Sequence, residues 1–255
     1  MTYIFFDEIQ HVTDFPDIIN SLNLKPTVDL YVTGSNAYML SSEIATLLSG
    51  RYVEIAMLPL SFKEYRKVSV VTDHLSQTYI EYVSKSSFPY TLELDTANEI
   101  SDYLNAVYNT IVVKDIMSRN KLSDVMMLES VIRFTADNIG NILSTKRIAD
   151  LMSADGRKID QKTVEKYLSI LCESFFLYEV KRYNIKGKQL LKTLGKYYLV
   201  DIGLRRMLLG SRSFDAGRIF GKYRFSGTLA SAEESVYRQD GYLEVDFCCY
   251  STRMT

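Results

Sequence analysis

Short apolar runs and helically spaced apolar positions alternate near the start of the chain. Residues 3–6 (YIFF) form an aromatic and β-branched run that stops at an acidic pair, which is typical of a buried strand. Apolar positions three and four residues apart predict a helix over Asp14–Leu22, and a second short strand follows at residues 30–32. The order strand, helix, strand predicts a parallel pair, so the polar residues after both strands are expected on one edge of a sheet.

The pattern changes after the second strand. A helix is predicted at residues 41–48, a short strand from Val53 and a helix start around Tyr65. Residues 68–134 alternate polar stretches with helical periodicity. The periodicity is clearest at Ile100, Tyr103, Leu104, Val107, Tyr108 and Ile111. These residues predict a helical segment.

Three further helical patterns occupy residues 125–137, Ser144–Met152 and Asp160–Ser174. Ser144 and Asp160 are typical N-cap residues. Two strands at residues 175–180 and 189–194 then flank the turn sequence NIKGK. Three helices followed by a β-hairpin predict a winged helix-turn-helix. The expected fold class is therefore α/β plus α, with a partial parallel sheet, a helical segment and the winged helix-turn-helix.

The composition indicates the cellular setting of the protein more than its function. The 255 residues are 47% hydrophobic and 24% charged, as in ordinary folded proteins. The formal net charge is -1, but Lys and Arg are concentrated in residues 144–206. Cys172, Cys248 and Cys249 fit neither a disulfide framework nor a zinc site, so a reducing, cytoplasmic setting is expected. No apolar run approaches membrane-spanning length, and neither a signal peptide nor a membrane partner is expected.

The first strand ends in the Walker B pattern of four apolar residues followed by Asp7 and Glu8. Acids at such a strand end hold magnesium, here through Asp7, and polarise the attacking water, here through Glu8. The same pattern also fits a helix N-terminus. Asn36, in TGSN after the second strand, is a candidate sensor of the γ-phosphate, or simply a turn residue. Arg51 is a candidate arginine finger for a neighbouring subunit, or an ordinary surface arginine.

The segments YIFFDEIQ, TGSNAYMLSSEIATLLSGRYVEI and LPLSFKEY closely resemble bacterial and archaeal AAA-type ATPases of the archaeal-ATPase-like superfamily. The stretches YLNAVYNTIVVKDI, STKRIADLM, KTVEKYLSIL and KYYLVDIGLR are similar to its middle portion. The resemblance implies ATP and Mg²⁺ as cofactors of the intact family and a homo-oligomer or partner ATPase subunit. It also implies a division into an ATPase part (1–66), a helical segment (67–136), a winged helix (137–209) and a remnant of a restriction-endonuclease-like domain (210–255).

One departure from that family concerns the phosphate loop, G-x-x-x-x-G-K-[ST], which matches nothing in the 255 residues. The amides and the lysine of that loop cradle the β- and γ-phosphates. Without them the Walker B acids would face the triphosphate with a repulsion that magnesium only partly offsets. The sequence therefore predicts a fragment, truncated at both ends, that neither binds nor hydrolyses ATP by itself.

A second departure lies near the end of the chain. Residues 220–239 fit no family pattern although the residues on either side do, and reading the codons for residues 221–240 one nucleotide later can restore a helix and a strand. We therefore hypothesise a pair of compensating frameshifts. Glu244 and Asp246 resemble the acidic strand of a nuclease core, or belong to a solvated strand. His11 and His74 are interpreted as structural.

The predicted winged helix is rich in basic residues. Val164, Tyr167, Leu168 and Leu171 share one face of its third helix, which leaves Gln161, Lys162 and Lys166 outward, as in a recognition helix. Lys186 and Lys188 are expected at the wing tip. The remaining basic residues of this segment are Lys146, Arg147, Arg157, Lys158, Lys181, Arg182 and Lys192. Such a face suits the phosphates of duplex DNA. Alternatively, the winged helix packs only on the nucleotide domain or on a partner protein.

Overall fold

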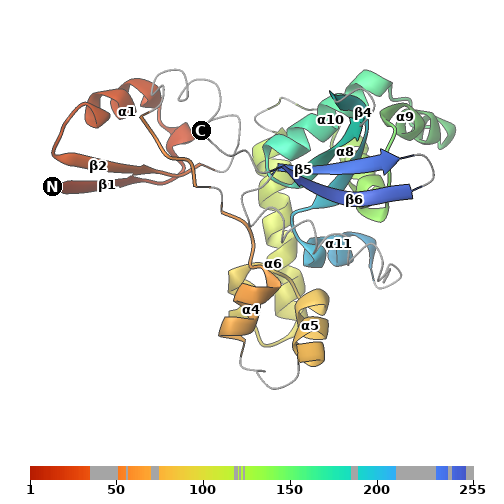
Figure 1. The fold of residues 1–255 in the computed structure, drawn as a ribbon, viewed down its shortest axis with the longest axis horizontal. Helices are drawn as coiled ribbons and strands as arrows, with labels where there is room; N and C mark the ends of the chain where they lie inside the picture. Colours follow the sequence, from red (N-terminus) through yellow and green to blue (C-terminus); the bar gives the residue numbers. More distant parts are fainter. Residues whose placement is uncertain are drawn as a thin grey trace. The chain divides into compact units, whose positions relative to one another are not determined.

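The computed structural model describes most of the chain as two compact units (Figure 1). The described residues are 1–34, 51–55, 57–69, 75–117, 120, 122, 124–184, 189–210, 234–240 and 243–250. The first unit comprises residues 1–57 with 173–175, and the second comprises 58–172 with 176–255. The four-part division expected from the sequence stays a prediction.

The first unit is built on two parallel strands. Strand β1 (Thr2–Phe6) pairs with β2 (Val28–Val32) in the register Ile4 opposite Leu30, and helix α1 (Phe15–Asn23) joins them after the short 3-10 helix η1 (Ile9–His11). The predicted strand, helix, strand order and the parallel pairing are confirmed. Of the residues that the structure describes in this unit, Ile9 and Ile19 are the buried apolar ones, so the part of the core that they form is small. Phe6, Phe15, Leu30 and Val32 pack around them.

The short strand predicted from Val53 is wrong. Residues 51–55 and 57 have no regular secondary structure, and Val53, Ile55 and Met57 are 87%, 78% and 91% exposed. An isolated apolar run has no stability as a strand without a hydrogen-bonding neighbour and a covered face. Among the described residues of this unit, β1 and β2 pair only with each other. The helix predicted at residues 41–48 lies outside the described residues.

The second unit begins with two short helices. Helix α4 (Phe62–Val68) starts three residues before the predicted position, because the Ser61 hydroxyl accepts from the Glu64 amide and the Glu64 carboxylate accepts from the Ser61 amide. Helix α5 (Leu75–Ser84) packs beside it. Tyr65 is 1% exposed, and its ring lies 5.1 Å from that of Tyr82. This packing places α4 in the second unit.

A long helical stretch follows, as predicted. After the 3-10 helix η2 (Pro89–Glu93), helix α6 (Ala97–Asn109) begins at a capping box of Thr96 and Glu99 and continues into the π-helix η3 (Thr110–Met117). Ile100, Leu104 and Tyr108 are buried, at the spacing that predicted the helix. The large core of the second unit forms around this face.

Helices α8 (Val125–Asp137), α9 (Thr145–Ala154) and α10 (Gln161–Glu173) lie where the three helical patterns predicted them. Ser144 caps α9 by accepting from the Arg147 amide at 3.4 Å, and Asp160 accepts from the Thr163 amide at 2.7 Å at the start of α10. The antiparallel strands β3 (Leu177–Asn184) and β4 (Gln189–Leu199) follow. Ile142, between α8 and α9, forms an isolated bridge to Lys196 of β4.

Helix α11 (Ile202–Leu209) packs against α5, α6 and α8 and holds distant parts of the second unit together. Its N-cap Asp201 is fully buried and accepts hydrogen bonds from the amide and the hydroxyl of Ser87. Arg205 donates to the carbonyl of Ala136 at the end of α8. Gly203 is required by close approach, since an added Cβ would lie 2.5 Å from the Lys85 carbonyl oxygen.

The last described elements are two strands. Strand β5 (Glu234–Asp240) pairs antiparallel with β6 (Leu243–Tyr250) and parallel with β3, which gives the sheet order β4-β3-β5-β6. Most of the segment attributed to a frameshift lies outside the described residues. Glu244 and Asp246 lie on β6, as the strand prediction required, and their role in metal binding stays a prediction.

Candidate functional site

The carboxyl ends of β1 and β2 meet, as the sequence predicted. Phe6 and Val32 are the last paired residues, and the Thr33 amide continues the ladder by donating to the Phe6 carbonyl at 2.8 Å. Asp7 and Thr33 therefore follow the two strands at the same level. The Thr33 hydroxyl donates to the Asp7 carboxylate oxygen Oδ1. The acidic end of one strand and the polar end of the other thus form a single cluster.

Glu8 turns the main chain at this point. Its φ of 49° and ψ of 46° lie in the left-handed region, which a residue with a side chain adopts only infrequently. The Glu8 amide donates to the Thr33 hydroxyl at 3.2 Å, and the Ile9 amide donates to the Thr33 carbonyl at 3.4 Å. The turn directs Ile9 into the core, where it is 2% exposed. Asp7 remains exposed, and Glu8 is half-buried.

The position of Asp7 fits the magnesium ion that the resemblance implies. Mg²⁺ is usually bound through one or two carboxylates together with substrate phosphates and water, so it needs no closed cage of protein ligands. Asp7 is exposed at a strand end, and Oδ1 is the oxygen that accepts from Thr33. Across the parts of the chain that the structure describes, no three His, Cys, Asp or Glu side chains are placed to hold a metal by themselves.

The structure also shows a residue to which the sequence had assigned no role. Thr33 belongs to the TGSN segment, but the candidate sensor of that segment was Asn36, which lies outside the described residues. The position of Thr33 in the sequence could have indicated this role, because the first residues after two parallel strands of matched register lie beside one another. Arg51 is exposed in the irregular segment of the first unit, and its role as an arginine finger stays a prediction.

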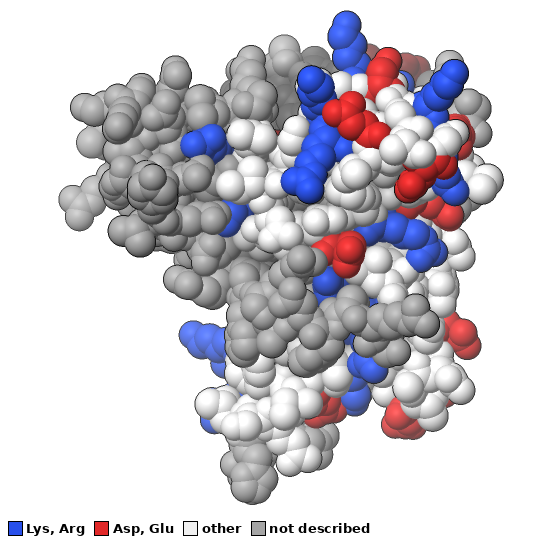
Figure 2. Space-filling model, turned by 90° about the vertical axis from the view of Figure 1, so that its right-hand side faces the viewer, with Lys and Arg blue, Asp and Glu red and all other residues white. Residues whose placement is uncertain are grey.

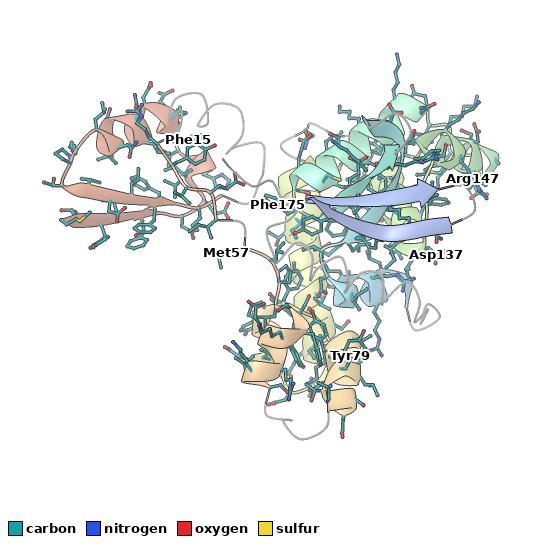
Figure 3. The ribbon with its side chains drawn as sticks, in the orientation of Figure 1. Phe15, Met57, Tyr79, Asp137, Arg147 and Phe175 are labelled. Atoms are coloured by element: carbon teal, nitrogen blue, oxygen red, sulfur yellow. The ribbon has the colours of Figure 1, made fainter. Side chains whose placement is uncertain are left out.

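The second candidate surface is the outward face of α10. Lys162 and Lys166 are exposed, whereas Val164 and Leu171 are fully buried and Leu168 is 2% exposed, so the predicted orientation of this helix is confirmed. Arg147 projects outward from the neighbouring helix α9 (Figure 3). Lys186 and Lys188 lie outside the described residues.

The charge on this part of the second unit is mixed. Figure 2 shows acidic and basic side chains next to one another on the face that carries α9. Glu165 of α10 is exposed and accepts from Thr145 and Gln161 at 3.0 and 2.8 Å. Hydrogen bonds from Thr163 lower the pKa of Asp160, and the nearby Lys162 lowers it further, which keeps a negative charge at the start of α10.

Arg157 is engaged within the protein. Its guanidinium donates to the Met126 carbonyl at 3.1 Å and to the Ser130 hydroxyl, which ties the loop before α10 to α8. This arginine therefore has a structural role that its sequence position had not indicated. No helix in the described part of the chain is long and apolar enough to cross a membrane.

Two protein families match this chain, one over the parallel strands of the first unit and one within the second unit. Residues 1–66, which contain the acid pair and both parallel strands, match the family described as an AAA domain. Residues 76–215 match the family described as Domain of unknown function (DUF8612). Because that match covers more than half of the 255 residues, the chain belongs to the DUF8612 family.

Two curated relatives extend beyond the region that they share with this chain. An uncharacterized protein of Haemophilus influenzae is 39% identical over an alignment of 213 positions, which covers 82% of this chain and 53% of that protein. Uncharacterized protein MJ1544 of Methanocaldococcus jannaschii is 26% identical over an alignment of 262 positions, which covers 97% of this chain and 58% of that protein. The chain thus spans about half the length of the curated relatives that it matches.

Proposed function

We propose that the first unit is one half of an AAA-type ATP site, namely the half that binds the magnesium ion and orients the attacking water. The observation that carries this proposal is the joining of the acid pair to the end of the neighbouring parallel strand through the hydrogen bond from Thr33 to Asp7. Ligands of open parallel sheets bind at the carboxyl ends of the strands, where these residues lie. The match of the same residues to an AAA domain supports the nucleotide as the ligand.

In this proposal the residues have separate roles. The carboxylate of Asp7 binds the magnesium ion of Mg-ATP, and the carboxylate of Glu8 orients the attacking water. Asn36 senses the γ-phosphate, and Arg51 serves the site of a neighbouring subunit in an oligomer. When bound, Mg²⁺ would neutralise part of the charge on the β- and γ-phosphates.

We further propose that the 255-residue polypeptide does not hydrolyse ATP by itself. Its sequence contains no phosphate-loop pattern, whose backbone amides and lysine supply most of the donors to the phosphates. Asp7 and Glu8 by themselves would repel the triphosphate. Affinity for Mg-ATP is therefore expected to be too weak for saturation in the millimolar range.

Isothermal titration calorimetry with Mg-ATP tests the expected weak affinity and, if the nucleotide binds, the role of Asp7. The wild-type chain and the Asp7→Ala variant should give the same unsaturated heats. Asp17→Ala, which removes an exposed aspartate from α1 of the same unit, is the matched control. A saturable heat that is lost in Asp7→Ala and kept in Asp17→Ala would contradict the expected weak affinity for Mg-ATP while supporting the site. A saturable heat unaffected by Asp7→Ala would remove the magnesium role of Asp7.

A second candidate function is binding of duplex DNA by the segment from α8 to β4, which we propose to be a winged helix. The element order of three helices and an antiparallel hairpin, with Ile142 bridged to β4, supports this proposal. Exposed Lys162 and Lys166 on the third helix favour contact with phosphates. The mixed charge and the internal contacts of Arg157 reduce the number of available cations. Weak binding, with few phosphate contacts, is therefore expected.

Fluorescence anisotropy on a labelled duplex tests the DNA proposal. Affinity should fall as salt rises from about 50 to 200 mM, since it comes from phosphate neutralisation, and the fall should be modest because few phosphates are contacted. Lys162→Ala and Lys166→Ala should each lower affinity on any sequence and flatten the salt slope by about one unit. Lys63→Ala, on exposed α4 surface, should leave both unchanged. Salt-independent binding, or equal effects of all three variants, would assign the segment to protein packing instead.

A further inference from the structure

The hydroxyl group of Thr33 is bound on both of its sides. It donates to the carboxylate of Asp7 and accepts from the amide of Glu8 at 3.2 Å. The backbone of the same residue accepts from the Ile9 amide at 3.4 Å and donates to the Phe6 carbonyl at 2.8 Å. One residue at the end of β2 therefore contacts four consecutive residues at the end of β1.

These contacts explain how the chain tolerates the backbone of Glu8. A left-handed conformation is unfavourable for a residue with a side chain, and surrounding contacts must determine it. The amide of Glu8 is held by the Thr33 hydroxyl, and the next amide is held by the Thr33 carbonyl. Thr33 therefore stabilises the turn of the main chain at Glu8, the residue directly after Asp7.

The same hydroxyl restricts the side chain of Asp7. An exposed carboxylate without a partner samples several rotamers, whereas a hydrogen bond to one of its oxygens selects one. Hydrogen-bond partners of metal-binding carboxylates orient them in this way. The Asp7 oxygen Oδ1 is engaged by Thr33, which leaves Oδ2 as the oxygen oriented for a metal.

We propose that Thr33 is a positioning residue for the acid pair: one hydroxyl orients the Asp7 carboxylate and fixes the main-chain turn that places Glu8. This inference rests on the proposed role of Asp7 as the magnesium-binding acid. Thr33 is also the first residue of the TGSN segment, which contains the candidate sensor Asn36.

The test compares Thr33→Val, which keeps the β-branched shape without the hydroxyl, with Thr33→Ser, which keeps the hydroxyl. Mn²⁺ alone is the probe, because it prefers the same oxygen ligands as Mg²⁺ and broadens nearby amide signals in NMR spectra. The measured quantity is the Mn²⁺ concentration that halves the Asp7 and Glu8 amide signals. Amides around Asp17 report nonspecific broadening in the same unit.

Thr33→Val should require about tenfold more Mn²⁺ than the wild type, the lower end of the usual effect of removing a partner of a metal ligand. Thr33→Ser should restore the wild-type value. Without metal, hydrogen exchange at the Glu8 amide should accelerate in Thr33→Val and not in Thr33→Ser. The backbone bond between Thr33 and Phe6 is kept in both variants, so the strand pairing serves as the internal check on folding.

The outcomes separate the two proposals. If Asp7→Asn leaves the Mn²⁺ response unchanged, the metal role of Asp7 fails, whatever Thr33 does. If Asp7→Asn abolishes the response but Thr33→Val keeps the wild-type value, the positioning role of Thr33 is overturned while the site stands. Failure of Thr33→Ser to restore the response would also overturn it, because the hydroxyl would then not be the group that acts.

Discussion

Replacement of Asp201 by alanine is expected to destabilise the second unit severely. The side chain of Asp201 is fully buried and accepts three hydrogen bonds, from the Ser87 amide at 2.7 Å, the Ser87 hydroxyl at 2.6 Å and the Leu204 amide at 2.9 Å. The first two come from the loop after α5, and the third caps α11. Alanine removes all three acceptor interactions at once.

The magnitude follows from the three donors left behind. A hydrogen bond to a charged group contributes about 1.5–3 kcal/mol, and a buried donor without a partner costs about 1–3 kcal/mol. The Ser87 hydroxyl can rotate, so the loss of its hydrogen bond is expected to cost an amount at the low end of this range. A decrease in unfolding free energy of about 4 kcal/mol is therefore expected. Asp201→Asn keeps the shape and one acceptor oxygen, and its effect should be intermediate.

Asp124→Ala is the matched control. Asp124 is also an aspartate N-cap of the second unit, at the start of α8, but it is exposed and accepts one bond, from the Met127 amide at 2.8 Å. Loss of an exposed cap of this kind costs about 1 kcal/mol. Urea unfolding followed by far-ultraviolet circular dichroism measures both variants. With a slope of about 2 kcal/mol/M, the midpoint should fall by roughly 2 M for Asp201→Ala and about 0.5 M for Asp124→Ala.

Equal midpoints for the two alanine variants would refute this reasoning. That result would mean that water reaches the Ser87 and Leu204 donors, or that the loop after α5 moves away from α11 at little cost. A change in the slope itself would instead point to separate unfolding of the two units, and hydrogen exchange at the buried α8 residues Val131 and Ile132 would then report the second unit directly.

Two further predictions follow from burial. Burial raises the pKa of Tyr65, Tyr108 and Tyr178 from 10.0 to about 12, so the stability that these neutral side chains contribute is complete below pH 10 and is lost as the pH rises through about 12. Tyrosinate absorbance should therefore rise in an early and a late step, and a single step near pH 10 would contradict their burial. Limited proteolysis should digest the first unit before the second, since only Ile9 and Ile19 are buried apolar residues among those described in the first unit. Early loss of the helical part would contradict this order.

Much of the local structure was readable from the sequence. The spacing of Val164, Leu168 and Leu171 predicted both the helix α10 and the face that it buries, because apolar residues three and four apart lie on one side of a helix. Ser144 and Asp160 marked the helix starts through the side-chain oxygen that each offers to a backbone amide. The strand, helix, strand order also predicted that the acid pair would meet the end of the next strand.

Other features depended on contacts between distant residues. The apolar residues near Val53 have the composition of a strand, but no described neighbour pairs with them. Thr33 acquired its position only through the register of β1 and β2. Asp201 and Ser87 are separated by 114 positions. Periodicity and capping are properties of neighbouring residues, so the sequence alone predicted α1, α6, α8, α9 and α10, and the strand, helix, strand order predicted the parallel pair. Which hydroxyl meets which carboxylate is a property of packing in three dimensions, so only the tertiary structure decided it.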